Sequence, residues 1–301
     1  MIPEFPQFKG LELSDKSDVE AHTKKFPPYS DFNFVSMWSW DIKGEMRISQ
    51  LNNNLVVRFT DYLTGKPFFS FLGDNMVNET VETLLEYSKQ EGLGEELKLV
   101  PEDCIKDIDK NKFKEEEDRD HHDYLYSVSE LKNMEGGKFA KKRNQVALFM
   151  KNHPKAEVKV FDLKDINIQG QMTSLFSKWL QEKIKEDEIF ESHEKIAVNR
   201  MLLALETCNL MGIGVFHNEK LEGFFINELT DSEHIVAHIS KTNKELAGIN
   251  SFLTKHNAVL LHPFEKQFFN YEQDLGIENL RVAKTRFRPI HFLKKYKLTY
   301  L

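Results

Sequence analysis

The chain has 301 residues, of which 40% are hydrophobic, 12% aromatic and 30% charged, and its formal net charge is −7. This apolar content fills one large core or two smaller ones, which excludes a disordered protein. Two cysteines exclude a disulfide-stabilised scaffold and a four-cysteine zinc site. There is no apolar run of about 18 residues and no signal-peptide pattern at the start, so we expect a cytoplasmic protein without a transmembrane segment.

The first half of the chain begins with helical patterns and continues with short strands. Helices are predicted at residues 18–26, 30–41 and 78–91, and short strands at 45–49, 54–62, 66–73, 96–100 and 123–128. A short helix is expected after Pro101, and Asn78 is a suitable N-cap for the longest helix. The acidic stretch at residues 106–123 is predicted to be an exposed loop.

The second half repeats this order of elements. Strands are predicted at residues 157–163, 212–218, 220–229, 233–241, 267–272 and 290–300, and helices at 166–184, 193–210, 245–261 and 277–287. A further helix at 136–150 lies between the halves, with an apolar stripe of Phe139, Val146, Phe149 and Met150.

A meander of three strands followed by a helix and a neighbouring strand predicts a mixed sheet with helices on both faces. This is the order of the GNAT acyltransferase fold. The fold class is therefore α/β (α+β), with two tandem GNAT-like domains, each a mixed, mostly antiparallel sheet flanked by helices. We expect an N-terminal domain at 1–134, a connecting basic helix at 135–155 and a C-terminal domain at 156–301.

Positive charge is concentrated in two segments that contain no acidic residue. The first is Gly136–Ala156, with Lys138, Lys141, Lys142, Arg143, Lys151 and Lys155. The second is Asn279–Leu301, with Arg281, Lys284, Arg286, Arg288, Lys294, Lys295 and Lys297. Such segments attract a phosphate-bearing partner even when the net charge is negative. Alternatively, they are solvated helix faces that balance acidic neighbours.

Three segments carry a resemblance to a known family: YSDFNFVSMWSWD at 29–41, YLYSVSELKNMEGGKFAKKRNQVALFMKNHP at 124–154 and NYEQDLGIENLRVAKTRFRPIHFLKKYKL at 270–298. Together they resemble a bacterial family related to the C-terminal catalytic domain of phosphatidylglycerol lysyltransferase. The resemblance implies two GNAT-like domains joined by a helix. It also implies aminoacyl transfer from aminoacyl-tRNA to an acceptor such as an anionic lipid, with peripheral lipid contact.

The loop expected to bind a donor lies at Ser240–Asn250. It contains Lys244 and Gly248 but not the glycine spacing with which GNAT enzymes hold the pyrophosphate of acetyl-CoA. Thr242 and Glu245 form a possible capping box, which would occupy the amides that a phosphate needs. The corresponding first-half loop, Gly73–Glu79, is acidic. The sequence therefore favours tRNA over acetyl-CoA as donor, with Lys244 left as a possible phosphate contact.

Candidate catalytic residues follow a strand near the end of the chain. Strand alternation places Asn270, Glu272 and Asp274 on one face, where either carboxylate can act as base or hold an ammonium group. Alternatively, these residues cap the next helix.

The candidate phosphate-binding residues are Lys141, Lys142, Arg143, Asn144, Lys244, Gly248, Arg281, Lys284 and Arg288. Arg281, Lys284 and Arg288 are expected on one helix face, and a structural ion pair is the alternative for Arg143 and Asn144. His234 and His238 share a strand face, but the spacing offers no third metal ligand, so we interpret them as hydrogen-bonded, partly buried residues.

Three functions remain compatible with these patterns. The first is an acyltransferase that moves an aminoacyl group from tRNA to an amine or hydroxyl of a lipid or small molecule. The second is an acetyl-CoA-dependent N-acetyltransferase. The third is a non-catalytic module that binds RNA or an anionic surface.

Overall fold

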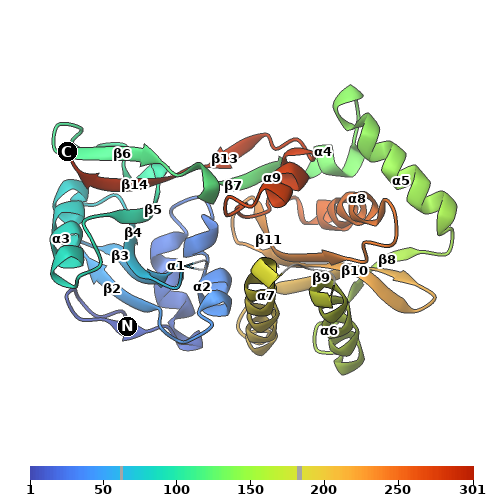
Figure 1. Cartoon of the computed structure of the whole chain (residues 1–301), viewed down its shortest axis with the longest axis horizontal. Helices are drawn as coiled ribbons and strands as arrows, with labels where there is room; N and C mark the ends of the chain where they lie inside the picture. Colours follow the sequence, from blue (N-terminus) through green and yellow to red (C-terminus); the bar gives the residue numbers. More distant parts are fainter. Residues whose placement is uncertain (62–63, 182–184) are drawn as a thin grey trace. The chain divides into compact units, whose positions relative to one another are not determined.

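The computed structural model describes residues 1–61, 64–181 and 185–301, and the chain forms two compact units (Figure 1). Unit 1 contains Met1–Asp123, Gln273–Ile277 and Phe292–Leu301, and unit 2 contains Tyr124–Glu272 and Glu278–His291. Among the described residues each unit is built on a seven-stranded sheet. The predicted strand end at residue 62 and helix end at 182–184 lie outside the described residues.

The sheet of unit 1 has the order β1-β2-β3-β4-β5-β14-β6. Its strands are β1 (Lys9–Gly10), β2 (Arg47–Leu51), β3 (Asn54–Thr60), β4 (Pro67–Leu72), β5 (Leu97–Pro101), β6 (Phe113–Glu117) and β14 (Lys295–Tyr300). Among the described strands of this sheet, only the β4–β5 pair is parallel. Helices α1 (Lys16–Thr23) and α2 (Phe34–Trp40) lie on one side of the sheet and α3 (Val77–Gln90) on the other (Figure 1).

The second sheet, which lies mostly in unit 2, has the order β13-β7-β12-β11-β10-β9-β8. Its strands are β7 (Asp123–Ser127), β8 (Glu157–Phe161), β9 (Leu210–His217), β10 (Lys220–Leu229), β11 (His234–Thr242), β12 (Phe268–Asn270) and β13 (His291–Leu293). Its helices are α4 (Val128–Asn133), α5 (Ala140–Asn152), α6 (Ile166–Gln181), α7 (Lys185–Leu203), α8 (Ile249–Leu261) and α9 (Glu278–Thr285). Helix α8, covered by α4 and α5, packs on one face of the sheet, and α6 packs on the other (Figure 1). Phe225 and Phe224 fill the two sides of this core.

The mixed, mostly antiparallel sheets agree with the predicted fold class, but the compact units are not contiguous in sequence. The sequence predicted domains at 1–134 and 156–301 with a helix at 135–155 between them. In the structure, β7 joins the sheet of unit 2, whereas β14 returns to the sheet of unit 1 between β5 and β6. A strand pattern shows that a segment needs hydrogen-bonded neighbours, but not which sheet supplies them.

The acidic stretch predicted to be an exposed loop contains strand β6. This strand pairs with β14 along its length, and the register places Glu116 opposite Lys297. Phe113 is buried at its start and stacks on Tyr300 with ring centroids 5.6 Å apart. An acidic strand is stable here because its neighbour is the basic C-terminal strand.

Four predicted helix details are wrong. Helix α7 spans Lys185–Leu203 rather than 193–210, and α8 begins at Ile249 rather than at 245. The N-cap of α3 is Met76 rather than Asn78. Met150, placed in the apolar stripe of α5, is 51% exposed.

Two lysines of the last basic segment form ion pairs inside unit 1. Lys295 is fully buried, and its Nζ contacts Asp31 and lies 2.7 Å from Oδ1 of Asp123. Lys294 pairs with Glu117 at 3.0 Å. These two lysines are therefore bound to the protein's own carboxylates.

Candidate active site in unit 2

The site begins at an irregularity between β10 and β11. Ile226 pairs with Ile239, and the next residue, Asn227, pairs with Ala237. His238 is therefore the extra residue of a β-bulge. Such bulges redirect a side chain and are common beside active sites.

The bulge places the His238 imidazole between two carboxylates. Its Nδ1 lies 3.0 Å from Oε1 of Glu272, and its Nε2 lies 3.3 Å from Oε2 of Glu228. The His238 and Glu228 residues are only 4% and 6% exposed, whereas the Glu272 side chain is 15% exposed. Burial alone would lower the pKa of His238, but the two carboxylates outweigh it and raise this pKa to about 9. His238 is therefore an imidazolium at neutral pH, and its Nδ1 lies against the Glu272 carboxyl group.

Strands β11 and β12 separate at this point. Their parallel pairing covers only His234–Val236 and Phe268–Asn270, although β11 continues to Thr242. Glu272 follows the end of β12 in a left-handed conformation with φ of 51°. The Asn270 Oδ1 accepts the Glu272 N–H at 2.8 Å, and the Glu272 carbonyl accepts the Tyr124 N–H at 3.1 Å. The Glu272 carboxylate is thereby fixed where the two strands part.

The structure does not place the three predicted catalytic residues on one strand face. Strand β12 ends at Asn270, so alternation does not extend to Glu272 and Asp274. Asp274 belongs to unit 1, where it is buried, accepts the Gly276 N–H at 2.9 Å and lies 3.4 Å from Arg119. Asp274 holds the turn that precedes α9 and does not cap a helix amide, and Glu272 alone of the two carboxylates contacts His238.

The two basic segments meet within unit 2. The Nζ of Lys142, on α5, lies 3.5 Å from the centroid of the Phe287 ring, just after α9. Lys142 is 9% exposed, and burial together with Arg286 and Lys141 lowers its pKa to about 8. An amine desolvated among like charges is a favourable place for an anion.

The other predicted phosphate contacts occupy different environments. Lys141 and Asn144 are exposed on α5. The Arg143 guanidinium donates to the carbonyls of Met134 and Gly136 at 2.6 and 2.7 Å, so it stabilises the turn before α5 instead of pairing with a carboxylate.

Residues Arg281, Lys284 and Arg288 do not form one exposed face. Lys284 is 6% exposed, and its Nζ donates to the Tyr271 carbonyl at 2.5 Å. Helix α9 ends at Thr285, and Arg288 follows with φ of 61°. Arg281 is half-buried on α9. The prediction of one helix face is therefore wrong for Arg288, which lies beyond the helix. It is also wrong to treat Lys284 as an exposed cation, because this side chain is buried.

The expected capping box in the β11–α8 loop does not form. Thr242 is the last residue of β11, and the Glu245 N–H donates to Oδ1 of Asn243 at 3.1 Å. Lys244 lies over the Trp179 ring, with Nζ 3.4 Å from its centroid. Gly248 is the N-cap of α8 with φ of 89°, and a Cβ there would lie 2.2 Å from the Gln145 carbonyl oxygen. Glu245 therefore does not cap the first amides of α8. The start of this helix is instead covered by α5, which packs directly against Gly248.

The corresponding loop of unit 1 is filled by a side chain of the same unit. Asn54 is buried, its Oδ1 accepts the Asn75 N–H at 3.1 Å, and its Nδ2 donates to the Asn75 carbonyl at 2.7 Å. The Gly73 N–H donates to the Cys104 Sγ at 3.3 Å. These amides are therefore engaged within the loop and do not face a phosphate.

The sequence analysis did not identify Glu228, and it interpreted His238 only as a hydrogen-bonded, partly buried residue. The signal for Glu228 was a carboxylate at the end of the apolar run of β10, where a buried charge needs a partner. A second buried pair joins Lys241 of β11 to Glu194 of α7 at 2.6 Å. Among the residues that the structure describes, no cluster of His, Cys, Asp or Glu is suited to a metal ion, and no helix is long and apolar enough to cross a bilayer.

Comparison with known proteins agrees with this architecture. The family model described as phosphatidylglycerol lysyltransferase, C-terminal, matches residues 23–299. A conserved protein of unknown function from Bacteroides thetaiotaomicron is similar over 100% of both chains, with 24% identity and a TM-score of 0.83. L-PGS from Bacillus licheniformis is similar over 99% of this chain and 93% of its own, with 12% identity and a TM-score of 0.61. A tandem GNAT protein from the clavulanic acid biosynthesis pathway covers 98% of both chains, with 8% identity and a TM-score of 0.50. Among curated proteins, none matches this chain.

Proposed function

Because this chain belongs to the phosphatidylglycerol lysyltransferase C-terminal family, with two GNAT-like sheets, we propose that it is an acyltransferase that moves an aminoacyl group from tRNA to an amine or hydroxyl acceptor. The acceptor is a lipid or a small molecule. The observation that supports this proposal best is the Glu272–His238 pair at the point where β11 and β12 separate.

Aminoacyl transfer from an ester requires mainly a correctly placed general base. The acceptor amine or hydroxyl attacks the ester carbonyl, a bond from the acceptor to that carbon forms, and the bond to the ribose oxygen of tRNA breaks. Glu272 takes the acceptor's proton, and the departing ribose oxygen receives it. His238, held positive by two carboxylates, keeps the Glu272 side chain oriented. Since aminoacyl esters are already activated, positioning supplies much of the acceleration.

The junction of the two basic segments supports RNA as the carrier. Lys142 is a buried amine beside Lys141 and Arg286. Exposed cations on the same helix, such as Lys151, add to the local positive charge. Phosphate contacts of this kind position a nucleic acid without reading its sequence.

The proposal is tested by single-turnover transfer from tRNA charged with radiolabelled amino acids to a mixture of amines, hydroxyl compounds and anionic lipid vesicles. We expect labelled product with at least one charged tRNA, and binding that weakens steeply as salt increases. The proposal would be rejected if no charged tRNA gave product and if the affinity for tRNA did not change with salt concentration.

Acetyl-CoA remains the alternative donor because Gly248 begins α8 without a side-chain cap, so this helix end can accept a phosphate. The carbonyl of Gln145 packed against Gly248 opposes this alternative. A thermal shift measurement with CoA decides between the two: a clear rise in melting temperature is expected only if CoA binds the folded protein.

A further inference from the structure

A second concave site lies in unit 2, formed by the end of α5, strand β8 and helix α8. It is an open pocket of about 590 Å³, lined by Met150, His153, Pro154, Ala156, Glu157, Val158, Lys159, Phe252 and His256. This volume is in the range of sites that hold small organic groups. None of these residues belongs to the His238 cluster, so the pocket needs a separate explanation.

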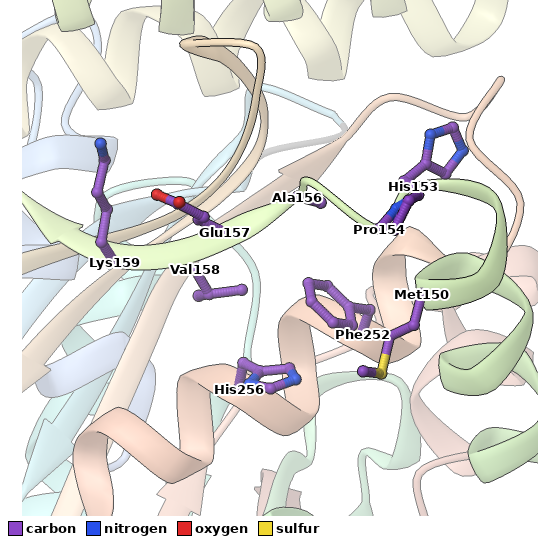
Figure 2. A pocket seen from close by; sticks show the side chains of 9 residues that line it. All are labelled: Met150, His153, Pro154, Ala156, Glu157, Val158, Lys159, Phe252 and His256. Carbon is purple, nitrogen blue, oxygen red and sulfur yellow. The ribbon is translucent and has the colours of Figure 1, made fainter.

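The pocket lining includes His153, Phe252 and His256, which belong to a longer row of ring contacts. His256 contacts Phe252 with centroids 4.3 Å apart, Phe252 contacts Phe149 at 4.6 Å, and Phe149 contacts His153 at 4.9 Å. The row ends at His217, 5.2 Å from His153. Figure 2 shows Met150, Phe252 and His256 gathered on the side of β8 to which Val158 points. A flat aromatic ligand can continue such a row by stacking.

Polar groups at the pocket suit a heteroaromatic ring better than a hydrocarbon chain. Burial and the neighbouring Lys255 lower the pKa of His256, so this imidazole is neutral at pH 7 and offers one donor and one acceptor. Among the described strands, β8 is the edge of its sheet and pairs only with β9. Its outer edge therefore presents backbone N–H and C=O groups beside the pocket.

The charge around the pocket is mainly positive, although the lining also includes Glu157. Lys151 and Lys155 are exposed at the end of α5 and in the turn to β8, inside the segment Gly136–Ala156 that has no acidic residue. Lys255 adds a third positive charge close to His256. Stacking rings next to lysines are the combination that single-stranded nucleic acids require.

We propose that this pocket seats an unpaired base of a single-stranded RNA segment, stacked against the half-buried His256 at the end of this row and beside Phe252, while the surrounding lysines contact its phosphates. The inference rests on the proposed function only for the choice of RNA, and it concerns a different surface from the transfer site. If the pocket instead held an acyl chain or a second copy of this protein, RNA binding would not depend on the presence of a base.

The test compares two fluorescently labelled hexamers in anisotropy titrations with the full chain: hexaadenylate RNA and an abasic ribose-phosphate hexamer of equal charge. Stacking predicts that the RNA binds roughly 5- to 100-fold more tightly. Ala156→Phe fills the pocket and His256→Ala removes one ring, so each is expected to bring this ratio close to one. Leu148→Ala, an exposed change on α5 outside the pocket, is expected to preserve it.

Equal affinity of wild type for both hexamers, or an unchanged ratio in both pocket variants, would overturn the inference. A melting curve identifies a variant that fails to fold. In that event competition on the wild type decides: AMP displaces the labelled RNA and ribose 5-phosphate does not.

The Glu272→Gln variant separates this inference from the proposed function. It is expected to lose transfer and to retain the preference for bases. Detectable transfer without any preference for bases refutes the pocket assignment alone. A preference for bases without any transfer refutes the proposed function alone.

Discussion

The Nδ1 of His238 lies 3.0 Å from Oε1 of Glu272, although 34 positions separate the two residues in the chain. The contact exists because a β-bulge redirects His238 and a left-handed turn presents Glu272. Glu228 completes the arrangement from the adjacent strand at 3.3 Å. The result is a Glu272 side chain that is partly exposed and held in one orientation.

Glu272 and Asp274 offer a matched pair for testing the catalytic assignment. We expect Glu272→Gln to reduce single-turnover transfer by about 100-fold or more, because the amide cannot accept a proton. Asp274→Asn keeps the turn at Gly276 and is expected to retain transfer at normal melting temperature or slightly below it. Equal losses in the two variants would remove the special role of Glu272.

The raised pKa of His238 predicts a pH-dependent stability. A histidine whose pKa is about 9 in the folded state and about 6.5 when unfolded binds its proton more tightly in the folded state. Its contribution is complete below pH 6.5 and is lost as the pH rises through 9. The free energy of unfolding should fall over this range by up to about 3 kcal/mol, since one pKa unit corresponds to about 1.4 kcal/mol.

Denaturant titrations of wild type and His238→Gln between pH 6 and 10 measure this effect. The difference in unfolding free energy between the two proteins should shrink as the pH rises. A difference that stays constant would show that His238 does not gain a proton on folding.

Lys295 and Lys294 are neighbours with opposite environments, and their substitutions should differ sharply. Lys295→Met leaves Asp31 and Asp123 buried without their cation, which typically costs about 3–5 kcal/mol. Lys294→Met removes an exposed pair with Glu117, which water and salt screen, so we expect little change in stability. Chemical denaturation of both variants at pH 7 provides the comparison, and similar losses would contradict the burial of the Lys295 pair.

Lys142 is predicted to favour ligand binding at the expense of stability. Lys142→Met removes a desolvated cation beside Lys141 and Arg286, so we expect the unfolding free energy to rise by about 1 kcal/mol. The same change should weaken RNA binding and lower the salt slope by about one. Lys138→Met is the control, because Lys138 is exposed and paired with Glu130 at 2.7 Å. An unchanged RNA affinity in Lys142→Met would exclude this contact.

Alanine substitutions at Gly248 and Gly92 distinguish loss of stability caused by a steric clash from loss caused by backbone strain alone. Both have positive φ, of 89° and 72°, but a Cβ at Gly248 meets the Gln145 carbonyl oxygen at 2.2 Å, whereas a Cβ at Gly92 meets nothing within 4 Å. Each alanine substitution carries backbone strain of about 1–3 kcal/mol. Gly248→Ala should lose additional stability as α5 is displaced from α8, and thermal melts of the two variants measure the difference.

The sequence by itself determined most of the strands and helices, but not β6, together with the mixed sheets and the two basic segments, because these depend on local periodicity and on charge counts. It also identified Glu272 as a candidate. It could not show that β14 pairs with β5 and β6, since strand partners are chosen by contacts between distant segments. Nor could it show the bulge at His238, because one unpaired residue leaves no trace in the hydrophobic pattern.

Burial of charge was the other property that only the tertiary structure decided. Lys142, Lys284 and Lys295 have the same sequence signature as exposed lysines in the two basic segments. In the folded chain each is nearly or fully buried, against Phe287, the Tyr271 carbonyl and two aspartates respectively. Whether a lysine attracts a ligand or stabilises the fold depends on which groups surround it, and those groups come from elsewhere in the chain.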